Sequence, residues 1–325
     1  CARPTHREPM STQEITKREA WVMAARPQTL PAAASPVVVG TGLAVHHGVF
    51  ALLPAVAALV GAGLIQIGTN FANDYYDHVK GADTEAREGF TRVTAGGLID
   101  PETVKRAMYL TFAASILLGT YLVSVGGAPI IVIGLLSVAS GIAYTGGPYP
   151  LGYHGLGDAF VFVFFGLVAV AGTYYVQAAA TLAEPFPVGI PPETLPVVAL
   201  VAALPVAALS TDILVVNNVR DKEEDATTGK RTLAVRFGYG FARAEFVAML
   251  ALAYAVPLWF LRRPAFTPAV ALPYLTLPLA VDITRTMLTE TAGEVLNPTL
   301  ERMGRLLAVY AVLFAVGLSV TTLPL

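Results

Sequence analysis

Two short acidic segments carry the residue types best suited to binding a metal ion together with a phosphorylated ligand. They are residues 70–77 (NFANDYYD) and 217–225 (NNVRDKEED). Side chains three, four, seven or eight positions apart lie on one face of a helix. In each segment this spacing aligns amide and carboxylate oxygens, which are ligands that Mg²⁺ prefers. The aligned residues are Asn70, Asn73, Asp77, Asn217, Asp221 and Asp225.

Carboxylates alone repel a diphosphate, so a metal ion must lie between the two. Magnesium commonly uses a few carboxylates together with substrate phosphates and water. The alternative is that these aspartates only cap helices or face water at the edge of a membrane. Two matching clusters, each at the end of an apolar stretch and each interleaved with Lys or Arg, favour a metal and phosphate site.

Cations that could neutralise the remaining phosphate charge lie within or close to these segments. They are Lys80, Arg92, Arg220, Lys230 and Arg231. Arginine has the bidentate geometry that phosphate binding requires. The alternative is that each of these residues contacts no substrate and is basic only because Lys and Arg are retained on the cytoplasmic side of a membrane. Because Arg220 lies between Asn217 and Asp221 on one helix end, we expect it to contact the substrate or to orient a carboxylate.

A third segment, 144–158 (YTGGPYPLGYHGLGD), contains no Lys or Arg. Its Gly, Pro and Tyr residues are typical of a compact turn near a membrane interface, where tyrosine serves as an anchor. A carbocation formed in a membrane pocket would instead need aromatic faces that stabilise it and exclude water. Tyr144 and Tyr149 are the candidates for that role, and both interpretations stay open.

The elements that position these segments are predicted to be membrane helices. The chain has 325 residues, of which 55% are hydrophobic and 14% are charged, with a mean hydropathy of +0.62. A soluble domain has fewer apolar and more charged residues. Crossing about 30 Å of hydrocarbon takes about 20 apolar residues, and about nine stretches qualify. They lie near 24–44, 50–73, 104–125, 128–145, 156–180, 196–217, 241–260, 267–288 and 304–323.

The chain therefore divides into a polar lead, residues 1–20, and one membrane domain, residues 21–325. Residues 1–9 are interpreted as an extension before a start at Met10. With nine crossings and a cytoplasmic N-terminus, all of the 21 Lys and Arg residues except Arg262 and Arg263 fall on the cytoplasmic side. This places the C-terminus outside and both acidic segments at the cytoplasmic face of the plasma membrane, four spans apart in a weak internal repeat.

Other classes of protein fit less well. The charges are concentrated in a few loops, so nucleic-acid binding is not expected. A secondary transporter is the main rival, because its sites also use intramembrane carboxylates. Such sites lie near the membrane midplane, where Asp212 and Asp282 are the only candidates, whereas both acidic segments end their spans. Soluble prenyl synthases with paired aspartates are excluded by the hydropathy. The oligomeric state is not indicated.

At four places the sequence resembles the UbiA superfamily of intramembrane prenyltransferases. Within that superfamily, the likeness is greatest to the branch that acts on 1,4-dihydroxy-2-naphthoate in menaquinone synthesis. The matching segments are 25–31 (ARPQTLP), 73–84 (NDYYDHVKGADT), 144–148 (YTGGP), and 217–221 (NNVRD) continuing to 229–233 (GKRTL). The resemblance runs from about Trp21 to the end of the chain. It implies an all-α bundle of nine transmembrane helices, a polar cap facing the cytoplasm, and a lateral opening for the isoprenoid tail.

The resemblance also implies a site. The superfamily's first motif ends in an aspartate, and this chain has Gly81 there, so Asp83 would supply the displaced carboxylate. The implied ligands of Mg²⁺ are Asn73, Asp77, Asp221 and Asp225, with Asp74 and Asp83 in support. The residues expected in catalysis are Asp77, Arg220, Asp221, Asp225 and Tyr144. Those expected to bind substrate are Arg26, Asn70, Lys80, Arg92, Thr145, Tyr149, Asn217, Lys230 and Arg231.

The implied reaction joins a polyprenyl diphosphate to an aromatic acceptor at the bilayer. With 1,4-dihydroxy-2-naphthoate the new bond forms at the carboxyl-bearing carbon, so carbon dioxide and diphosphate leave and demethylmenaquinone results. Some base must accept the phenolic proton, and the sequence does not indicate which residue does so. Other acceptors of the superfamily, namely 4-hydroxybenzoate, homogentisate or a glycerol phosphate lipid precursor, remain alternatives.

Overall fold

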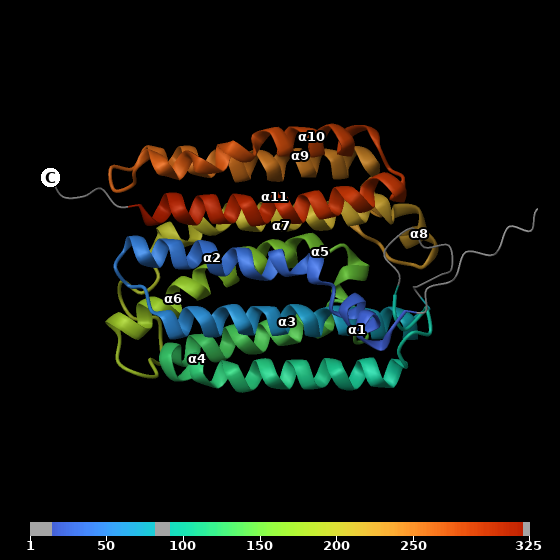
Figure 1. The fold of residues 1–325 in the computed structure, drawn as a ribbon, viewed down its shortest axis with the longest axis horizontal. Helices are drawn as coiled ribbons and strands as arrows, with labels where there is room; N and C mark the ends of the chain where they lie inside the picture. The colour runs from blue at the N-terminus through green and yellow to red at the C-terminus, as the bar shows by residue number, and fades with distance from the viewer. Residues whose placement is uncertain (1–14, 82–91, 321–325) are drawn as a thin grey trace, which may run out of the picture.

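A bundle of long helices forms this chain, as a computed structural model shows for residues 15–81 and 92–320 (Figure 1). Within these ranges every regular element is a helix. Seven helical stretches there are long and apolar enough to cross a membrane. In chain order the elements are α1 (Lys17–Ala25), η1 (Pro27–Thr29), α2 (Leu30–His46), α3 (Leu52–Val79), α4 (Pro101–Ala143), η2 (Leu151–His154), α5 (Gly157–Val161), η3 (Phe162–Val168), α6 (Ala169–Leu182), α7 (Val197–Arg220), α8 (Lys222–Thr227), α9 (Leu233–Leu261), η4 (Pro268–Thr276), α10 (Leu277–Thr289) and α11 (Gly293–Ser319). The all-α membrane fold expected from the sequence is confirmed.

Helix α4 explains part of the difference between seven stretches and the nine crossings expected. It has 43 residues, and a straight helix of that length would measure roughly 65 Å, about twice the hydrocarbon thickness. Instead the chain bends at Gly127, where φ is 65° and ψ is −150°. A Cβ there would lie 1.8 Å from the carbonyl oxygen of Pro187, so only glycine fits. The two arms coincide with the separate spans expected at 104–125 and 128–145. The expected crossing near 267–288 falls on η4 and α10, and the count of nine stays a prediction.

The entry into the bundle is irregular, as the Arg and Pro residues of 25–31 predict. Helix α1 begins with a capping box in which Thr16 and Glu19 satisfy each other's backbone N–H groups. It ends at Arg26, whose backbone is left-handed with φ 51°. The 3-10 helix η1 and then α2 follow, with prolines in their first turns, where a missing N–H costs nothing.

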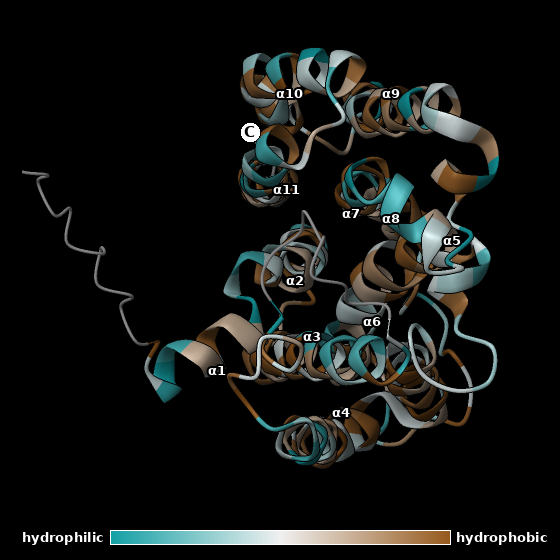
Figure 2. Ribbon diagram, turned by 90° about the vertical axis from the view of Figure 1, so that its right-hand side faces the viewer, coloured by the Kyte–Doolittle hydropathy of each residue, from teal (hydrophilic) through white to brown (hydrophobic). Residues whose placement is uncertain are grey.

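The core of the bundle lies where α2, α6, α7, α9 and α11 pack together. Small residues allow close approach, since a Cβ on Gly166 would lie 2.1 Å from the Cβ of Ala207. Gly166 belongs to η3, a π-helical stretch that separates α5 from α6. Such stretches often mark functional positions in membrane and soluble helices. In the end-on view α6 lies near the centre of the bundle, and it contacts α2, α3, α4 and α7 (Figure 2).

The C-terminal ends of α3 and α7 lie at one end of the bundle, together with α1 and α8 (Figure 1). Both acidic segments are therefore at the same end, as their separation by an even number of spans predicts. Asp77 and Asp225 both lie within 4 Å of the ammonium group of Lys230. The side of the membrane that this end faces remains a prediction.

Candidate active site

A cavity of about 690 Å³ begins between the two acidic segments and continues among the helices. Its polar end contains most of the residues that the sequence singled out. Those are Arg26, Asn70, Asn73, Asp77, Arg92, Tyr144, Thr145, Asn217, Arg220, Asp221, Asp225 and Lys230. Farther along, aliphatic and aromatic residues of α3, α4, η3 and α6 replace the polar ones. The cavity can thus hold a ligand with a charged head and an apolar tail.

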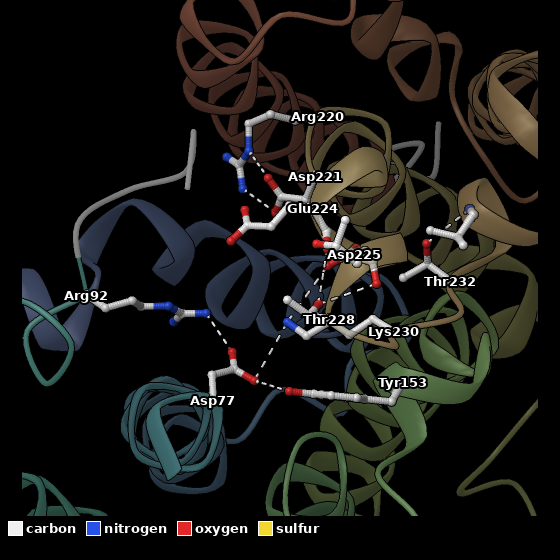
Figure 3. Close-up of polar contacts among 12 residues, drawn as sticks. Asp77, Arg92, Tyr153, Arg220, Asp221, Glu224, Asp225, Thr228, Lys230 and Thr232 are labelled. Carbon is white, nitrogen blue, oxygen red and sulfur yellow. Dashed lines mark hydrogen bonds and ion pairs between the residues drawn. The ribbon is translucent and has the colours of Figure 1, made fainter. Parts of the chain in front are cut away.

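Three polar contacts, from three different residues, converge on Asp77 (Figure 3). Its side chain is 2% exposed, so its charge must be compensated within the protein. One carboxylate oxygen, Oδ2, accepts a 2.9 Å hydrogen bond from Nη2 of Arg92. The other, Oδ1, accepts a 2.9 Å bond from the hydroxyl of Tyr153 and lies 3.7 Å from Nζ of Lys230. The carboxylate is held in place from both sides.

Lys230 joins the two acidic segments. Its Nζ lies 3.7 Å from Oδ1 of Asp77 on α3 and 3.9 Å from Oδ1 of Asp225 on α8. The same ammonium group lies 5.0 Å from the ring centroid of Tyr153, within the range of a cation–π contact. An anion that enters this end of the cavity therefore meets a cation placed between two carboxylates.

The second segment is organised by Arg220, the last residue of α7. Its Nε and Nη2 donate to the two oxygens of Asp221, at 2.6 and 2.8 Å, in a bidentate pair. Its Nη1 donates at 2.8 Å to the side-chain oxygen of Asn297 on α11. A guanidinium at a helix C-terminus also interacts favourably with the helix dipole. Arg220 orients Asp221, one of the two roles expected for it.

The segments of chain that cover the cavity are tied to α3. Asn73 accepts a 2.9 Å bond from the hydroxyl of Thr145, and Lys80 donates to the carbonyl oxygen of Thr145. Burial lowers the pKa of Lys80, an effect that nearby Asp77 opposes and Lys230 reinforces. Asn70 donates at 2.9 Å to the carbonyl oxygen of Ala25, which brings the turn at Arg26 against α3.

Four of the predicted site residues that the structure describes do not line the cavity, namely Asp74, Lys80, Tyr149 and Arg231. Asp74 is 1% exposed and does not line the cavity, because it points to the other face of α3. Its Oδ1 accepts a 2.5 Å bond from the hydroxyl of Thr94, and its Oδ2 accepts from the N–H of Val93 at 3.3 Å. Asp74 thus fixes the segment that carries Arg92. Asp83 lies outside the described residues.

Tyr149 and Arg231 are also away from the cavity. Tyr149 is 58% exposed and stacks on His154, with ring centroids 3.6 Å apart. The side chain of Arg231 is exposed, although its backbone N–H donates at 2.8 Å to the carbonyl oxygen of Tyr153. Lys80 does not line the cavity. Its ammonium group donates instead to the carbonyl oxygen of Thr145, a residue that does line it.

Tyr153 is the site residue that the sequence did not single out. It belongs to the same loop as Tyr144 and Tyr149, and no spacing rule distinguishes the three tyrosines. Tyr144 also lines the cavity, next to Gly157. Burial raises the pKa of the Tyr144 hydroxyl, and the charges of Asp158, Asp225 and Asp77 raise it further. Tyr144 therefore stays neutral at physiological pH.

The described side chains around the cavity offer oxygen ligands for the Mg²⁺ that the sequence implies, but they do not enclose a metal by themselves. In the described ranges no three His, Cys, Asp or Glu side chains gather closely enough to enclose a metal. Asp77 lies on one wall of the cavity and Asp221 and Asp225 on another, with amide oxygens of Asn73 and Asn217 beside them. Magnesium usually binds through one or two carboxylates and completes its shell with substrate phosphates and water. Separate carboxylates around a cavity with cations therefore fit a magnesium diphosphate better than a bare ion.

Sequence relatives show the family to which the chain belongs. The family model for the UbiA prenyltransferase family matches residues 33–293. A 1,4-dihydroxy-2-naphthoate octaprenyltransferase of Escherichia coli is 40% identical over 74% of this chain and 76% of its own. One from Mycobacterium leprae is 36% identical over 92% of this chain and 96% of its own. These matches favour the prenyltransferase interpretation over the transporter.

Solved structures share the fold at low identity. A UbiA homologue from Aeropyrum pernix superimposes with a TM-score of 0.64 at 14% identity, covering 86% of this chain and 96% of its own. Another from Archaeoglobus fulgidus, bound to DMAPP and Mg²⁺, gives a TM-score of 0.60 at 17% identity, covering 91% and 99%. Taken with the family match over most of its length, the bundle and its paired acidic segments identify the chain as a member of the UbiA prenyltransferase family, and hence as a prenyltransferase.

Proposed function

We propose that this protein transfers a polyprenyl group from an isoprenyl diphosphate to 1,4-dihydroxy-2-naphthoate and depends on Mg²⁺ to do so. The observation that carries the proposal is the meeting of both acidic segments at Lys230, at the polar end of a cavity that becomes apolar along its length. A charged head and an isoprenoid tail match these two parts. The relatives that bear this activity in their names support the choice of acceptor.

The diphosphate is assigned to the polar end of the cavity. Asp77, Asp221 and Asp225 would hold Mg²⁺, with oxygens of Asn73 and Asn217 as further ligands. A bound magnesium diphosphate supplies Lewis-acid stabilisation of the leaving group. Arg92, Arg220 and Lys230 add positive charge, which offsets the charge that develops on the diphosphate oxygens when the C–O bond breaks.

The acceptor is assigned to the space next to Tyr144 and Arg26, which both line the cavity. The ring of Tyr144 would stabilise the allylic cation through its π face and exclude water from it. The ring carbon that bears the carboxylate forms the new C–C bond, and the C–CO₂ bond breaks. Carbon dioxide is lost in place of a ring proton, so the net transfer requires no base, in contrast to the base expected from the sequence. The products are diphosphate, carbon dioxide and the quinol form of demethylmenaquinone.

We also assign the polar end of the bundle to the cytoplasmic side of the plasma membrane. The basic residues of the described chain are concentrated near Lys80, Arg92, Arg220 and Lys230, at this same end, and the positive-inside rule retains such residues in the cytoplasm. The charged diphosphate head of the donor, and the acceptor, would reach the site from that side.

The test is an assay of the purified protein in lipid with Mg²⁺, a polyprenyl diphosphate and each candidate aromatic acid. We expect a decarboxylated prenyl naphthoquinol, identified by mass spectrometry, only from 1,4-dihydroxy-2-naphthoate. Preferential prenylation of 4-hydroxybenzoate or homogentisate would overturn the choice of acceptor. An absence of product with every acceptor, together with ion-coupled uptake in proteoliposomes, would overturn the enzymatic role.

A further inference from the structure

Gln66 of α3 carries an unfilled hydrogen-bond position at the wall of the cavity. The residue lines the cavity and is 7% exposed. Its Oε1 atom is buried and has no hydrogen-bond partner among the described residues. Native proteins satisfy nearly all of their buried polar atoms, so such an atom needs a physical explanation. Gln66 lies on the same face of α3 as Asp77, about three turns of helix farther from the polar end.

The orientation of the Gln66 amide follows from its neighbours. Nδ2 of Asn70 donates at 2.9 Å to the carbonyl oxygen of Ala25, which can only accept. Oδ1 of Asn70 is therefore the atom that faces Gln66, and it accepts from Nε2 of Gln66 at 3.4 Å. The same Nε2 donates at 3.0 Å to the hydroxyl oxygen of Thr29. Both hydrogens of the amide nitrogen have acceptors, so the unfilled position is one that accepts a hydrogen bond.

The surroundings of Gln66 match the space to which the aromatic acceptor is assigned. The hydroxyl of Thr29 donates at 2.8 Å to the carbonyl oxygen of Arg26, and Thr29 and Arg26 both line the cavity. Gln66 thus adjoins the turn at Arg26. An isoprenoid tail and a fully ionised diphosphate bring no hydrogen-bond donor to this wall, whereas the hydroxyl group of an aromatic acceptor does.

We propose that Oε1 of Gln66 accepts a hydrogen bond from a hydroxyl of the aromatic acceptor and thereby selects among acceptors. This inference rests on the proposed function, since it assigns one contact of the same substrate. In 1,4-dihydroxy-2-naphthoate the 1-hydroxyl lies beside the carboxylate and donates to it within the molecule. The 4-hydroxyl has no such partner, and it is the donor that Gln66 receives. The contact orients the ring and leaves the bonds that form and break unchanged.

Ser210 of α7 also lines the cavity and has a hydroxyl without a partner among the described residues. A serine hydroxyl in a helix can rotate toward the carbonyl oxygen four residues earlier, as Thr211 does at 2.8 Å to Ala207. The amide oxygen of Gln66 has no equivalent, because the N–H groups inside a helix already donate to carbonyl oxygens. Gln66 therefore needs a donor from outside its own helix.

A water molecule is the other source of a donor for Oε1 of Gln66. The two occupants differ in what they predict for catalysis. A hydroxyl of the acceptor makes the preference among acceptors depend on Gln66, and a bound water does not. The experiment therefore measures a preference between two acceptors and not activity alone.

The test compares 1,4-dihydroxy-2-naphthoate with 1-hydroxy-2-naphthoate, which lacks only the 4-hydroxyl. Both keep the 1-hydroxyl next to the carbon that is alkylated, so both can react. We expect the wild type to favour the dihydroxy acceptor by about tenfold or more in kcat/KM, chiefly through KM, because the other acceptor leaves Oε1 unpaired. Gln66→Met has an apolar side chain of similar length, and its ratio should approach one. Dissociation constants measured with Mg²⁺ and a non-reactive diphosphate analogue should give the same ratios without turnover.

Gln177→Met is the matched control. Gln177 on α6 is buried, its Oε1 also has no partner among the described residues, and it does not line the cavity. Its Nε2 donates to the hydroxyl of Thr41 at 3.1 Å and to the carbonyl oxygen of Thr173 at 3.0 Å. The acceptor ratio of this variant should equal that of the wild type.

Thr29→Val separates the contact with the acceptor from a displacement of the turn at Arg26. The variant removes the hydroxyl that holds Gln66 and Asn70, but Oδ1 of Asn70 still orients the Gln66 amide. We expect both acceptors to bind less tightly and their ratio to stay close to that of the wild type. A ratio near one in Thr29→Val would assign the preference to the turn and would overturn the role of Oε1.

Two further outcomes would overturn the inference. Equal use of both acceptors by the wild type would do so without any variant, even if Gln66→Met failed to fold. An unchanged preference in a folded Gln66→Met would do so as well, and would indicate water at Oε1. Failure of the wild type to prenylate either naphthoate, together with prenylation of 4-hydroxybenzoate, would instead overturn the proposed function.

Discussion

The hydroxyl of Tyr153 donates a 2.9 Å hydrogen bond to Oδ1 of Asp77, which connects the loop before α5 to the acidic end of α3. A second bond anchors Tyr153, since its carbonyl oxygen accepts from the N–H of Arg231 at 2.8 Å. The loop therefore positions one of the assigned metal ligands. It also brings an aromatic face within 5.0 Å of Lys230.

Tyr153→Phe should lower kcat/KM by roughly 10- to 100-fold, because a hydrogen bond to a charged group is worth about 1.5 to 3 kcal/mol. The ring and its contact with Lys230 remain in the variant, so the loss reports the hydroxyl alone. Steady-state kinetics at several Mg²⁺ concentrations measure the effect. Tyr149→Phe is the control, since Tyr149 is exposed and stacks on His154. Equal activity in both variants would remove Tyr153 from the site.

Asp77→Asn should abolish turnover, because the amide retains the size of the side chain and loses the negative charge that holds a magnesium ion. The same result is expected for Asp221→Ala. Activity is measured by product formation, and insertion and folding by the elution profile in detergent. If either variant kept near-normal activity at saturating Mg²⁺, that carboxylate would be only a structural partner of Arg92 or Arg220.

Asp74→Asn should act on stability more than on the metal. One oxygen of Asp74 accepts a hydrogen bond from the N–H of Val93 and the other accepts one from the hydroxyl of Thr94. In the variant an NH₂ group replaces one of these oxygens, so two hydrogen-bond donors face each other there. A buried unsatisfied group costs about 1 to 3 kcal/mol. We expect a lower Tm, with an unaltered Mg²⁺ concentration for half-maximal activity. A large shift of that Mg²⁺ concentration would instead make Asp74 a metal ligand.

Arg220→Lys should impair catalysis although the charge is kept. Lysine cannot reproduce the bidentate pair with Asp221 together with the bond to Asn297. We expect kcat to fall by about tenfold or more, because the variant loses at least one hydrogen bond to a charged group. Arg231→Lys serves as the control, because the side chain of Arg231 is exposed and away from the cavity. Comparable losses in both variants would contradict the assigned role of Arg220.

Removal of divalent ions should stop the reaction. Chelation with EDTA is expected to abolish product formation, and added Mg²⁺ is expected to restore it. Ca²⁺ should restore it poorly, because it is larger and takes more ligands than one or two carboxylates and a diphosphate provide. Isothermal titration of a non-hydrolysable diphosphate analogue, with and without Mg²⁺, tests binding separately. Tight binding of the analogue to Asp77→Asn without metal would contradict a magnesium-bridged site.

Features that depend only on neighbouring residues in the chain could be predicted from the sequence. Hydropathy and the positions of Lys and Arg indicate a membrane bundle, because each crossing needs its own apolar stretch. Helical spacing places Asn73 and Asp77 on one face, and both line the cavity. The same spacing places Asp74 off that face, and its carboxylate does point elsewhere. Its inclusion among the metal ligands came from the family motif, which does not state the face on which each residue lies.

The sequence by itself determined the class of fold, the ends of the helices that carry charge, and the residue types available there, since hydropathy and helical periodicity are properties of neighbouring residues. Only the tertiary structure decided which cations and hydroxyls reach Asp77. Arg92, Tyr153 and Lys230 come from three different segments, and their convergence depends on how loops fold across the end of the bundle. For the same reason Tyr153 enters the site while Tyr149, four residues earlier in the same loop, faces outward.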